Sequence, residues 1–213
     1  MDTIFKDLIL SGEVVVYMDD ILIATPDNLT HHRQLVHRVL DRLEEHDLYL
    51  KPKKCVFEVR EVEFLGVILG HGQVRMDPVK VQGVLNWPIP QNLKDVRSFL
   101  GFYSLYRRFV KGFATLARPL NDLLKKEVPW EWTPARQHAF EVLKERITQA
   151  PVLAMPGCEK PFELEVDASN YALGAVLNQR DSNNQIHPVA FYSATVTKRR
   201  VDSYYTVMTH VSK

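Results

Sequence analysis

The stretch from Val14 to Thr25, VVVYMDDILIAT, constrains the fold of this chain more than any other. Two runs of strand-forming apolar residues flank the adjacent acids Asp19 and Asp20, which predicts two short strands, 14–17 and 21–25, joined by a tight turn. Near-continuous apolar runs are typical of strands covered on both faces, so we expect the turn to project from a well-buried sheet.

The acid pair at this turn has two interpretations. In the first, it is an ordinary surface turn, and both carboxylates stay in water. In the second, a divalent cation offsets the repulsion between the two charges. Mg²⁺ ions held by carboxylates can bridge phosphate oxygens and activate an attacking hydroxyl. The buried sheet expected beneath the turn favours the second interpretation, because metal-dependent chemistry requires the two acids to project from a rigid edge.

Length and composition set outer limits on the protein. A chain of 213 residues is long enough for one large domain or two small ones, and its net charge of +1 does not by itself indicate a nucleic-acid binder. Cys55 and Cys158 lie far apart and in no metal-ligand spacing, so we expect neither a disulfide framework nor a zinc site. With no secretory signal and no apolar run of about 18 residues, we expect an intracellular protein of the cytoplasm or nucleus with no membrane partner.

The rest of the chain alternates between helical and strand patterns, which predicts an α+β fold. The expected helices cover 29–50, 93–111, 116–124 and a segment that begins at Pro134 after the cap Thr133. The expected strands cover 56–59, 62–69, 74–76, 162–167, 172–178 and 189–192, with a turn at 70–72.

Three histidines, His31, His32 and His37, fall on or beside the polar face of the first long helix. They could form a metal site or simply be solvated. No acid or cysteine completes a ligand set in the sequence, so we expect solvated side chains.

Several motifs resemble those of one family, in the order in which that family has them. YMDD between two apolar strands resembles the polymerase motif of reverse transcriptases, and LKPKKC followed by EFLGVIL is similar to their lysine-bearing segment and primer-grip hairpin. Residues 84–126 resemble the thumb of gypsy-class long-terminal-repeat retrotransposon polyproteins. Residues 130–156 resemble their connection segment, and 162–179 the opening strands of their ribonuclease H.

This resemblance covers essentially the whole chain and implies its organisation. We expect the C-terminal half of a polymerase palm, with the YMDD and primer-grip hairpins, over residues 1–77. Thumb-like helices follow over 78–127 and a connection segment over 128–160. A truncated ribonuclease H-like domain, with an incomplete sheet, occupies 161–213.

The resemblance also implies a reaction, RNA-directed DNA synthesis, in which a primer 3′-hydroxyl attacks the α-phosphate of a deoxynucleotide with the help of two Mg²⁺ (or Mn²⁺) ions. Asp19 and Asp20 match the catalytic carboxylates that bind metal. Residues implied to lie near the nucleotide or primer are Tyr17, Met18, Lys53, Lys54, Phe64, Leu65 and Gly66. Cations implied to contact the backbone of an RNA/DNA primer–template duplex are Lys94, Arg97, Arg107, Arg108 and Lys111.

Most of these assignments have an ordinary structural alternative. The two lysines could mark a solvated strand entrance, with only one of them near the pyrophosphate. Phe64 and Leu65 could be core, and the thumb cations a solvated helix face. We expect Tyr103 and Tyr106 to be core residues that do not stack on bases.

Two departures from the family pattern limit what the isolated chain is expected to do. The family places a third metal carboxylate on a strand well upstream of YMDD, and Asp2, Asp7 and Glu13, the acids before Tyr17, do not match it. Asp167 matches the first catalytic acid of ribonuclease H, or is a polar-face strand residue. His210 or a neighbour stands where the family has a glutamate. We expect neither polymerase nor ribonuclease H activity from the isolated chain.

Three hypotheses follow. The chain is a reverse transcriptase segment that works with the remaining polyprotein segments or a dimer partner, a decayed reading frame of a retroelement, or a non-enzymatic module that binds nucleic acid through its thumb.

Overall fold

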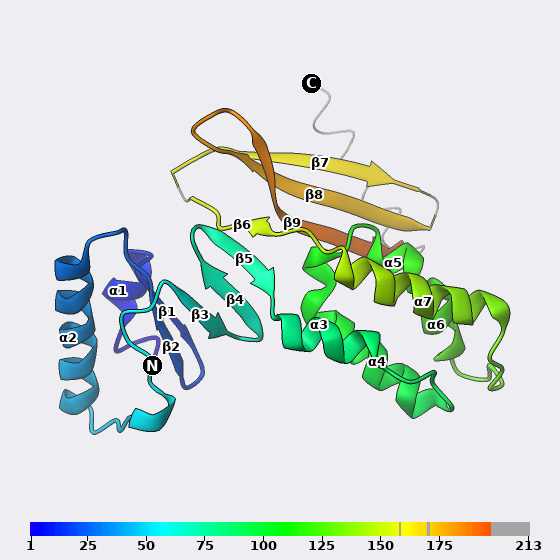
Figure 1. The fold of residues 1–213 in the computed structure, drawn as a ribbon, viewed down its shortest axis with the longest axis horizontal. Helices are drawn as coiled ribbons and strands as arrows, with labels where there is room; N and C mark the ends of the chain where they lie inside the picture. The colour runs from blue at the N-terminus through cyan, green and yellow to red at the C-terminus, as the bar shows by residue number, and fades with distance from the viewer. Residues whose placement is uncertain (158, 170, 197–213) are drawn as a thin grey trace. The chain divides into compact units, whose positions relative to one another are not determined.

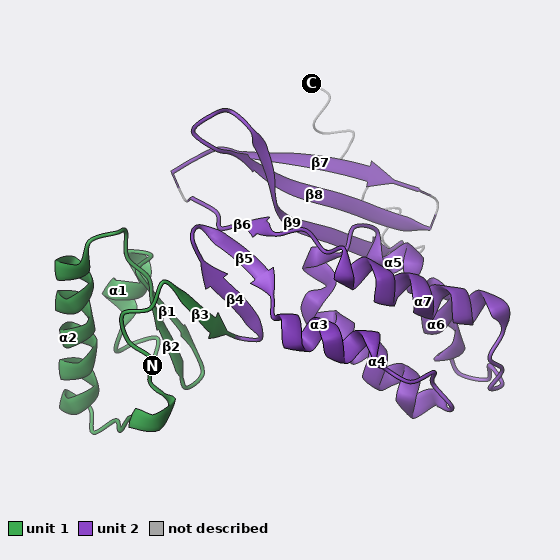
Figure 2. Ribbon diagram, in the orientation of Figure 1, with its two compact units in different colours: residues 1–64 green, residues 65–213 purple. Residues whose placement is uncertain are grey.

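The structure is a computed structural model that describes residues 1–157, 159–169 and 171–196. The chain divides into two compact units, residues 1–64 and 65–213 (Figures 1 and 2). Both contain helices and antiparallel sheets, so the predicted α+β fold is confirmed. No helix in the described ranges has both the length and the apolar character needed to span a bilayer.

The first unit packs a β-hairpin against helices. Its elements are α1 (Lys6–Leu10), β1 (Val14–Tyr17), β2 (Asp20–Ile23), α2 (Leu29–Glu45), the 3₁₀ turn η1 (Pro52–Lys54) and β3 (Glu61–Phe64). Helix α2 begins after Asn28, whose side chain accepts a hydrogen bond from the backbone N–H of His31. One face of α2 then contributes Leu35, Val39 and Leu43 to a small buried core.

The hairpin corrects one prediction, because it is buried on one face only. Val14 is buried and Val16 packs against the same core, whereas Val15 is 44% exposed and Tyr17 51% exposed. Side chains alternate between the two faces of a strand, so the second face of this hairpin is open to solvent in the described structure. The continuous apolar run therefore gave a wrong expectation of two-sided burial.

Two strand predictions downstream are also wrong. Residues 56–59 have no regular structure, and the strand expected over 62–69 is interrupted between Phe64 and Val67. The chain turns there, with φ of 50° at Leu65 and 78° at Gly66. Such φ values cannot continue a strand, so a glycine inside an apolar run marks a break here.

The second unit combines two sheets with a group of helices. Its elements are β4 (Val67–Gly70), β5 (Gln73–Met76), α3 (Pro78–Leu85), α4 (Leu93–Tyr106), η2 (Arg107–Phe109), α5 (Phe113–Leu116), α6 (Arg118–Leu123), α7 (Pro134–Thr148), β6 (Leu153–Ala154), β7 (Phe162–Ala168), β8 (Ala172–Arg180) and β9 (Ile186–Thr195). Strand β5 pairs with both β4 and β6, and β7, β8 and β9 form an antiparallel meander. Thr133 caps α7 and Pro134 is its first residue, as predicted.

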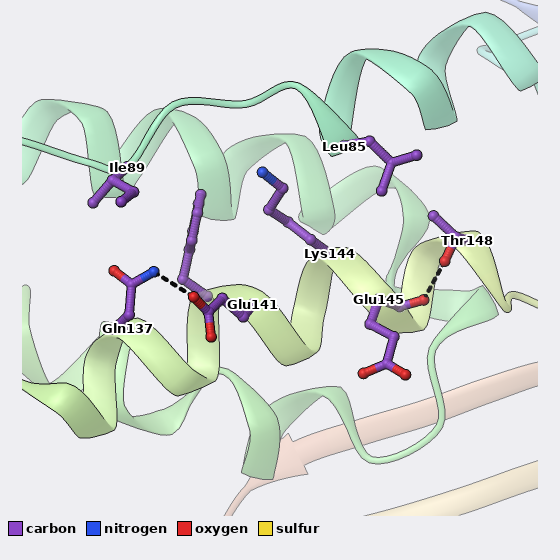
Figure 3. A pocket seen from close by; sticks show the side chains of 8 residues that line it. Leu85, Ile89, Gln137, Glu141, Lys144, Glu145 and Thr148 are labelled. Atoms are coloured by element: carbon purple, nitrogen blue, oxygen red, sulfur yellow. Dashed lines mark hydrogen bonds between the residues drawn. The ribbon is translucent and has the colours of Figure 1, made fainter.

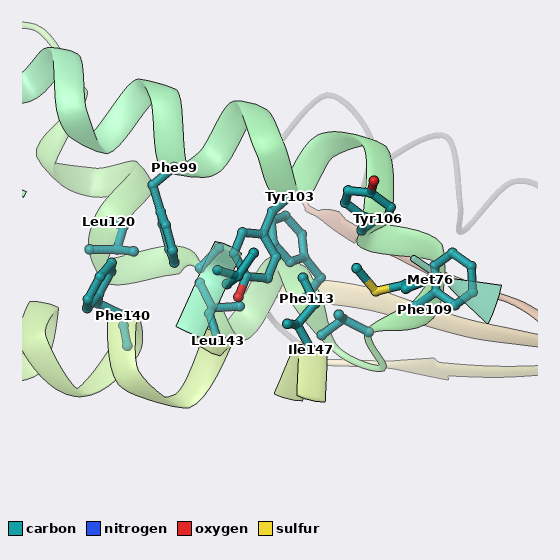
Figure 4. Close-up of a cluster of buried hydrophobic side chains, with 14 of the residues drawn as sticks. Met76, Phe99, Tyr103, Tyr106, Phe109, Phe113, Leu120, Phe140, Leu143 and Ile147 are labelled. Atoms are coloured by element: carbon teal, nitrogen blue, oxygen red, sulfur yellow. The ribbon is translucent and has the colours of Figure 1, made fainter. Parts of the chain in front are cut away.

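A large apolar core joins these helices to the strands (Figure 4). Phe99, Tyr103 and Tyr106 from α4 are buried in it, with Phe140 from α7 and Phe113 from α5. The rings of Phe99 and Phe140 lie 4.6 Å apart between centroids, and those of Phe99 and Tyr103 lie 4.8 Å apart. The expectation that both tyrosines are core residues is confirmed.

Candidate active site

The YMDD turn joins β1 to β2 through a two-residue loop. Tyr17 pairs with Asp20 at the end of the ladder, which leaves Met18 and Asp19 as the loop. Met18 has a φ of 54°. Positive φ at the first loop residue is a property of type II′ hairpin turns, where glycine usually stands. A side chain in this region costs on the order of 1–3 kcal/mol, and such strain tends to collect at functional sites.

The turn presents its side chains to solvent. Met18 is 77% exposed, and Asp19 and Asp20 are both exposed. Asp20 lies on the open face of the hairpin, across from Tyr17. Neither carboxylate forms a hydrogen bond or ion pair within the described residues. The two acids thus keep all of their oxygen lone pairs for an external ligand.

This donor set fits a divalent metal ion in part. Carboxylate oxygens are the ligands that Mg²⁺ and Mn²⁺ prefer, and two adjacent acids supply them at one place. In the part of the chain that the structure describes, no group of three or more His, Cys, Asp or Glu side chains is arranged to hold a metal ion. Asp19 and Asp20 therefore offer two of the carboxylate donors that such an ion would need, and their assignment to a metal site stays a prediction.

The sequence predicts three solvated histidines near this hairpin, but two of them have hydrogen-bond partners. His31 Nε2 lies 2.5 Å from Glu13 Oε1, and His32 Nδ1 lies 3.0 Å from Thr25 Oγ1. Both contacts connect α2 to residues next to the hairpin strands. Only His37 is exposed as expected. No sequence pattern indicated the His31–Glu13 contact, because the two residues are 18 positions apart.

Lys53 and Lys54 lie in η1, and both are exposed. Pro52 opens this 3₁₀ turn, which displays the two lysine side chains in succession. Their assignment to a pyrophosphate-binding role stays a prediction.

Phe64, Leu65 and Gly66 are the residues predicted to form a primer grip. Phe64 ends β3 and is half-buried, while Leu65 is 38% exposed. The Tyr106 hydroxyl donates a hydrogen bond of 2.9 Å to the carbonyl of Gly66. A Cβ added to Gly66 would lie 3.1 Å from Leu105 Cδ2, a tight contact, and the φ of 78° favours glycine at this position.

The predicted duplex-contacting cations divide into two kinds. Lys94, Arg97, Arg108 and Lys111 are exposed. Arg107 is half-buried, and its guanidinium donates a hydrogen bond to the backbone carbonyl of Ser193 in β9. The Ser193 hydroxyl in turn accepts a hydrogen bond of 2.9 Å from the Ala114 backbone N–H. Arg107 therefore has a structural role between η2 and β9 that sequence spacing did not reveal.

Asp167 lies in β7, paired with Gly174, and its side chain is exposed. It lines a cavity of about 280 Å³ together with Lys111, Thr115 and Ser169. The glutamate-equivalent position His210 falls outside the described residues, as does Cys158. Asp167 and Lys111 thus line one cavity, and the assignment of Asp167 as a ribonuclease H acid stays a prediction.

A larger cavity, of about 490 Å³, lies between α3 and α7 (Figure 3). Leu85, Ile89 and Phe140 give it an apolar floor, and Lys144 at its edge donates a hydrogen bond of 2.9 Å to the Trp87 carbonyl. No predicted site residue lines this cavity. The proline-rich stretch that contains Ile89 was the one sequence signal that could have drawn attention to it.

Two family models match the chain. Residues 1–69 match the reverse transcriptase (RNA-dependent DNA polymerase) family. Residues 132–209 match the RNase H-like domain found in reverse transcriptase, and this range begins inside the segment predicted as a connection. Reverse transcriptases generally use divalent metal ions, consistent with the donor set at the YMDD turn.

Curated relatives include polyproteins of fission yeast transposons. The Transposon Tf2-3 polyprotein of Schizosaccharomyces pombe is 37% identical over 191 residues, and the Tf2-7 polyprotein is 36% identical. These alignments cover 90% of this chain and 14% of each polyprotein.

Solved structures share the fold. The foamy viral protease-reverse transcriptase in complex with an RNA/DNA hybrid matches with a TM-score of 0.77 and 23% identity, over 92% of this chain and 26% of that chain. The same enzyme in complex with dsDNA matches with a TM-score of 0.75 and 21% identity, over 98% of this chain and 46% of that chain. These structures show the fold that the chain shares. The two family models and the Tf2 relatives together show that the chain belongs to the reverse transcriptase family, and that it matches the reverse transcriptase and RNase H-like region of retrotransposon polyproteins.

Proposed function

We propose that this chain serves RNA-directed DNA synthesis by a gypsy-class retrotransposon, as the part of the polymerase that carries the YMDD turn, the primer grip and the thumb. One observation carries the proposal: Asp19 and Asp20 stand exposed on a strained hairpin turn, with no protein partner in the described chain. The substrates are a primer–template duplex of RNA and DNA and deoxynucleotides. These substrates place the reaction inside the cell, in the cytoplasm or the nucleus.

Asp19 and Asp20 would hold Mg²⁺ or Mn²⁺, and the bound ion would supply stabilisation of phosphate charge and activation of the primer hydroxyl. Tyr17 and Met18 border the primer end and the incoming nucleotide, because they occupy the same turn. One of the η1 lysines, Lys53 or Lys54, supplies positive charge near the leaving pyrophosphate. Leu65 and Gly66, with Phe64, support the primer terminus.

The thumb contributes affinity for the duplex. Lys94, Arg97, Arg108 and Lys111 are exposed and contact phosphates, whereas the guanidinium of Arg107 is already bound to β9. Phosphate contacts position a duplex without reading its sequence, as a polymerase requires.

The 213 residues alone do not complete the polymerase centre. The family uses three metal carboxylates, and the described residues bring two together at the turn. The ribonuclease H-like sheet likewise supplies one acid of the family's set, Asp167. We propose that both activities need further polyprotein segments or a dimer partner.

Transfer into a working relative tests the polymerase role. The matching segment of the Tf2-3 reverse transcriptase is replaced by the 191 aligned residues of this chain, and DNA synthesis is measured on a homopolymer RNA template. We expect synthesis that Asp19→Asn reduces by orders of magnitude. The exposed acid Asp41, changed to Asn, is the matched control on α2. Synthesis that survives Asp19→Asn would refute the assignment of the turn.

The isolated chain tests the remaining part of the proposal. We expect no incorporation in the same assay but salt-dependent binding of a primer–template duplex. Incorporation that disappears in Asp19→Asn would show that two carboxylates suffice. Lack of duplex binding at low salt would contradict the role of the thumb.

A non-enzymatic nucleic-acid-binding module is the second candidate, favoured by the exposed thumb cations. It differs in one measurable respect. A hybrid enzyme that binds duplex with unchanged affinity but synthesises no DNA, even with an intact YMDD turn, would favour the binding module.

A further inference from the structure

We propose that Tyr106 is a positioning residue for the primer grip, acting through the Gly66 carbonyl. This inference rests on the proposed function of the Leu65–Gly66 turn. It adds a residue of the thumb helix to the machinery that places the primer terminus.

The hydroxyl of Tyr106 reaches 40 positions back along the chain to donate its 2.9 Å hydrogen bond to Gly66. Tyr106 is 1% exposed, and its ring centroid lies 4.8 Å from that of Phe102 and 6.5 Å from that of Phe109. A buried hydrogen-bond donor on a fixed ring has little freedom to move. Its acceptor is therefore fixed relative to α4.

The turn needs such an anchor. Leu65 and Gly66 are consecutive residues with positive φ, and Leu65 is not a glycine. Strained backbone of this kind persists only where surrounding contacts enforce it. The Tyr106 hydroxyl contacts the Gly66 carbonyl, and it packs close to the turn together with the Leu105 side chain: a Cβ added at Gly66 would lie 3.2 Å from the hydroxyl and 3.1 Å from Leu105 Cδ2.

The consequence concerns the geometry of primer and duplex together. Helix α4 also carries Lys94 and Arg97, the exposed cations proposed to hold the duplex. All of these residues belong to the second unit. The hydrogen bond from Tyr106 to Gly66 thus fixes the position of the turn relative to α4. The turn supports the primer terminus, and α4 holds the duplex backbone.

Tyr103 provides a matched control on the same helix. It is fully buried like Tyr106, but its hydroxyl has no hydrogen-bond partner among the described residues. Tyr103→Phe and Tyr106→Phe therefore remove the same oxygen from similar surroundings, and only the second change removes a contact to Gly66.

The experiment uses the 213-residue chain with a duplex whose primer carries 2-aminopurine at its 3′ terminus. In Tyr106→Phe we expect amide hydrogen exchange at Gly66 and Val67 to rise by about fivefold. We expect the fluorescence of the terminal 2-aminopurine to change, while the Kd stays within about twofold because the phosphate contacts remain. In Tyr103→Phe we expect none of these changes.

Each arm can overturn the inference. Unchanged exchange at Gly66 would show that the hydroxyl does not hold the turn. Faster exchange with unchanged terminal fluorescence would reduce Tyr106 to a purely structural role. A wild-type chain that binds no duplex would refute the proposed function as well, whereas the exchange arm would still report on the hydrogen bond alone. Leu105→Ala, at a half-exposed position, gives a second variant that loosens the turn without touching the hydroxyl.

Discussion

At the scale of single residues, two tyrosines one helical turn apart have opposite roles. Tyr106 is anchored to Gly66, whereas the hydroxyl of Tyr103 is buried without a partner in the described structure. A buried polar group without a hydrogen bond lowers stability, and its environment also opposes ionisation. Burial raises the pKa of the Tyr103 hydroxyl above its ordinary value of 10.0.

Tyr103→Phe should therefore stabilise the chain, by about 1 kcal/mol in the free energy of unfolding at neutral pH. The gain should grow above about pH 10, because the unfolded tyrosine then releases a proton that the folded one keeps, and the wild-type chain loses stability as pH rises. Urea unfolding of both proteins at neutral and alkaline pH measures the difference. A loss of stability at neutral pH would mean that an ordered water satisfies the hydroxyl.

At the scale of elements, an ion pair fastens the short helix α1 to α2 in the first unit. Arg42 Nη2 lies 2.7 Å from Asp7 Oδ2, and Arg42 Nη1 donates a 3.1 Å hydrogen bond to the Ile4 carbonyl. A helix of five residues has little stability of its own, so such tertiary contacts matter for it. The Arg42 guanidinium lowers the pKa of Asp7 to about 2 from 3.8.

This shift predicts an acid-dependent loss of stability. The contribution of Asp7 is complete above pH 3.8 and disappears as the pH falls through about 2, since the unfolded carboxyl takes up its proton first. Asp7→Asn should be less stable than the wild type at neutral pH and should lose less stability on acidification. Urea midpoints at neutral and acidic pH measure this. Asp41→Asn, an exposed acid on α2, should behave like the wild type, and a similar acid response of Asp7→Asn would contradict the assignment.

At the scale of the whole molecule, a chain with a net charge of +1 is proposed to bind a polyanion. Local arrangement must supply the attraction, and we propose that the exposed Lys94 and Arg97 on α4 do so in the second unit. Arg107, a few residues further on, is bound to β9. Cations of one basic segment thus have two proposed roles, duplex binding for Lys94 and Arg97 and a structural contact for Arg107.

Two arginine variants separate these uses. Arg97→Gln should reduce the slope of log affinity against log salt for a duplex by about one, with little effect on unfolding. Arg107→Gln should lower the thermal midpoint, because it removes the hydrogen bond to Ser193, and it should change the salt slope less. Titrations at several salt concentrations, with thermal unfolding of each variant, provide the comparison. The reverse pattern would exchange the roles of the two arginines.

The sequence by itself determined the features that depend on near neighbours. Alternating and helical patterns located β1, α2, α4, α7 and the C-terminal meander, and Thr133 before Pro134 marked the start of α7. The ordered series of motifs was enough to indicate the reverse transcriptase family, since YMDD and its flanks are local. The turn at Leu65 and Gly66 was not predicted, because the apolar run through Gly66 has the pattern of one continuous strand.

Only the tertiary structure decided which side chains meet. It joined Arg107 to Ser193 across 86 positions, Tyr106 to Gly66 across 40 and His31 to Glu13 across 18, and it left one face of the YMDD hairpin open. Periodicity reports which face of an element is apolar, but not which distant element covers that face. Contacts between remote residues follow from the packing of whole elements, which is why the sequence could indicate candidate site residues only one by one and the fold revealed which side chains hold them.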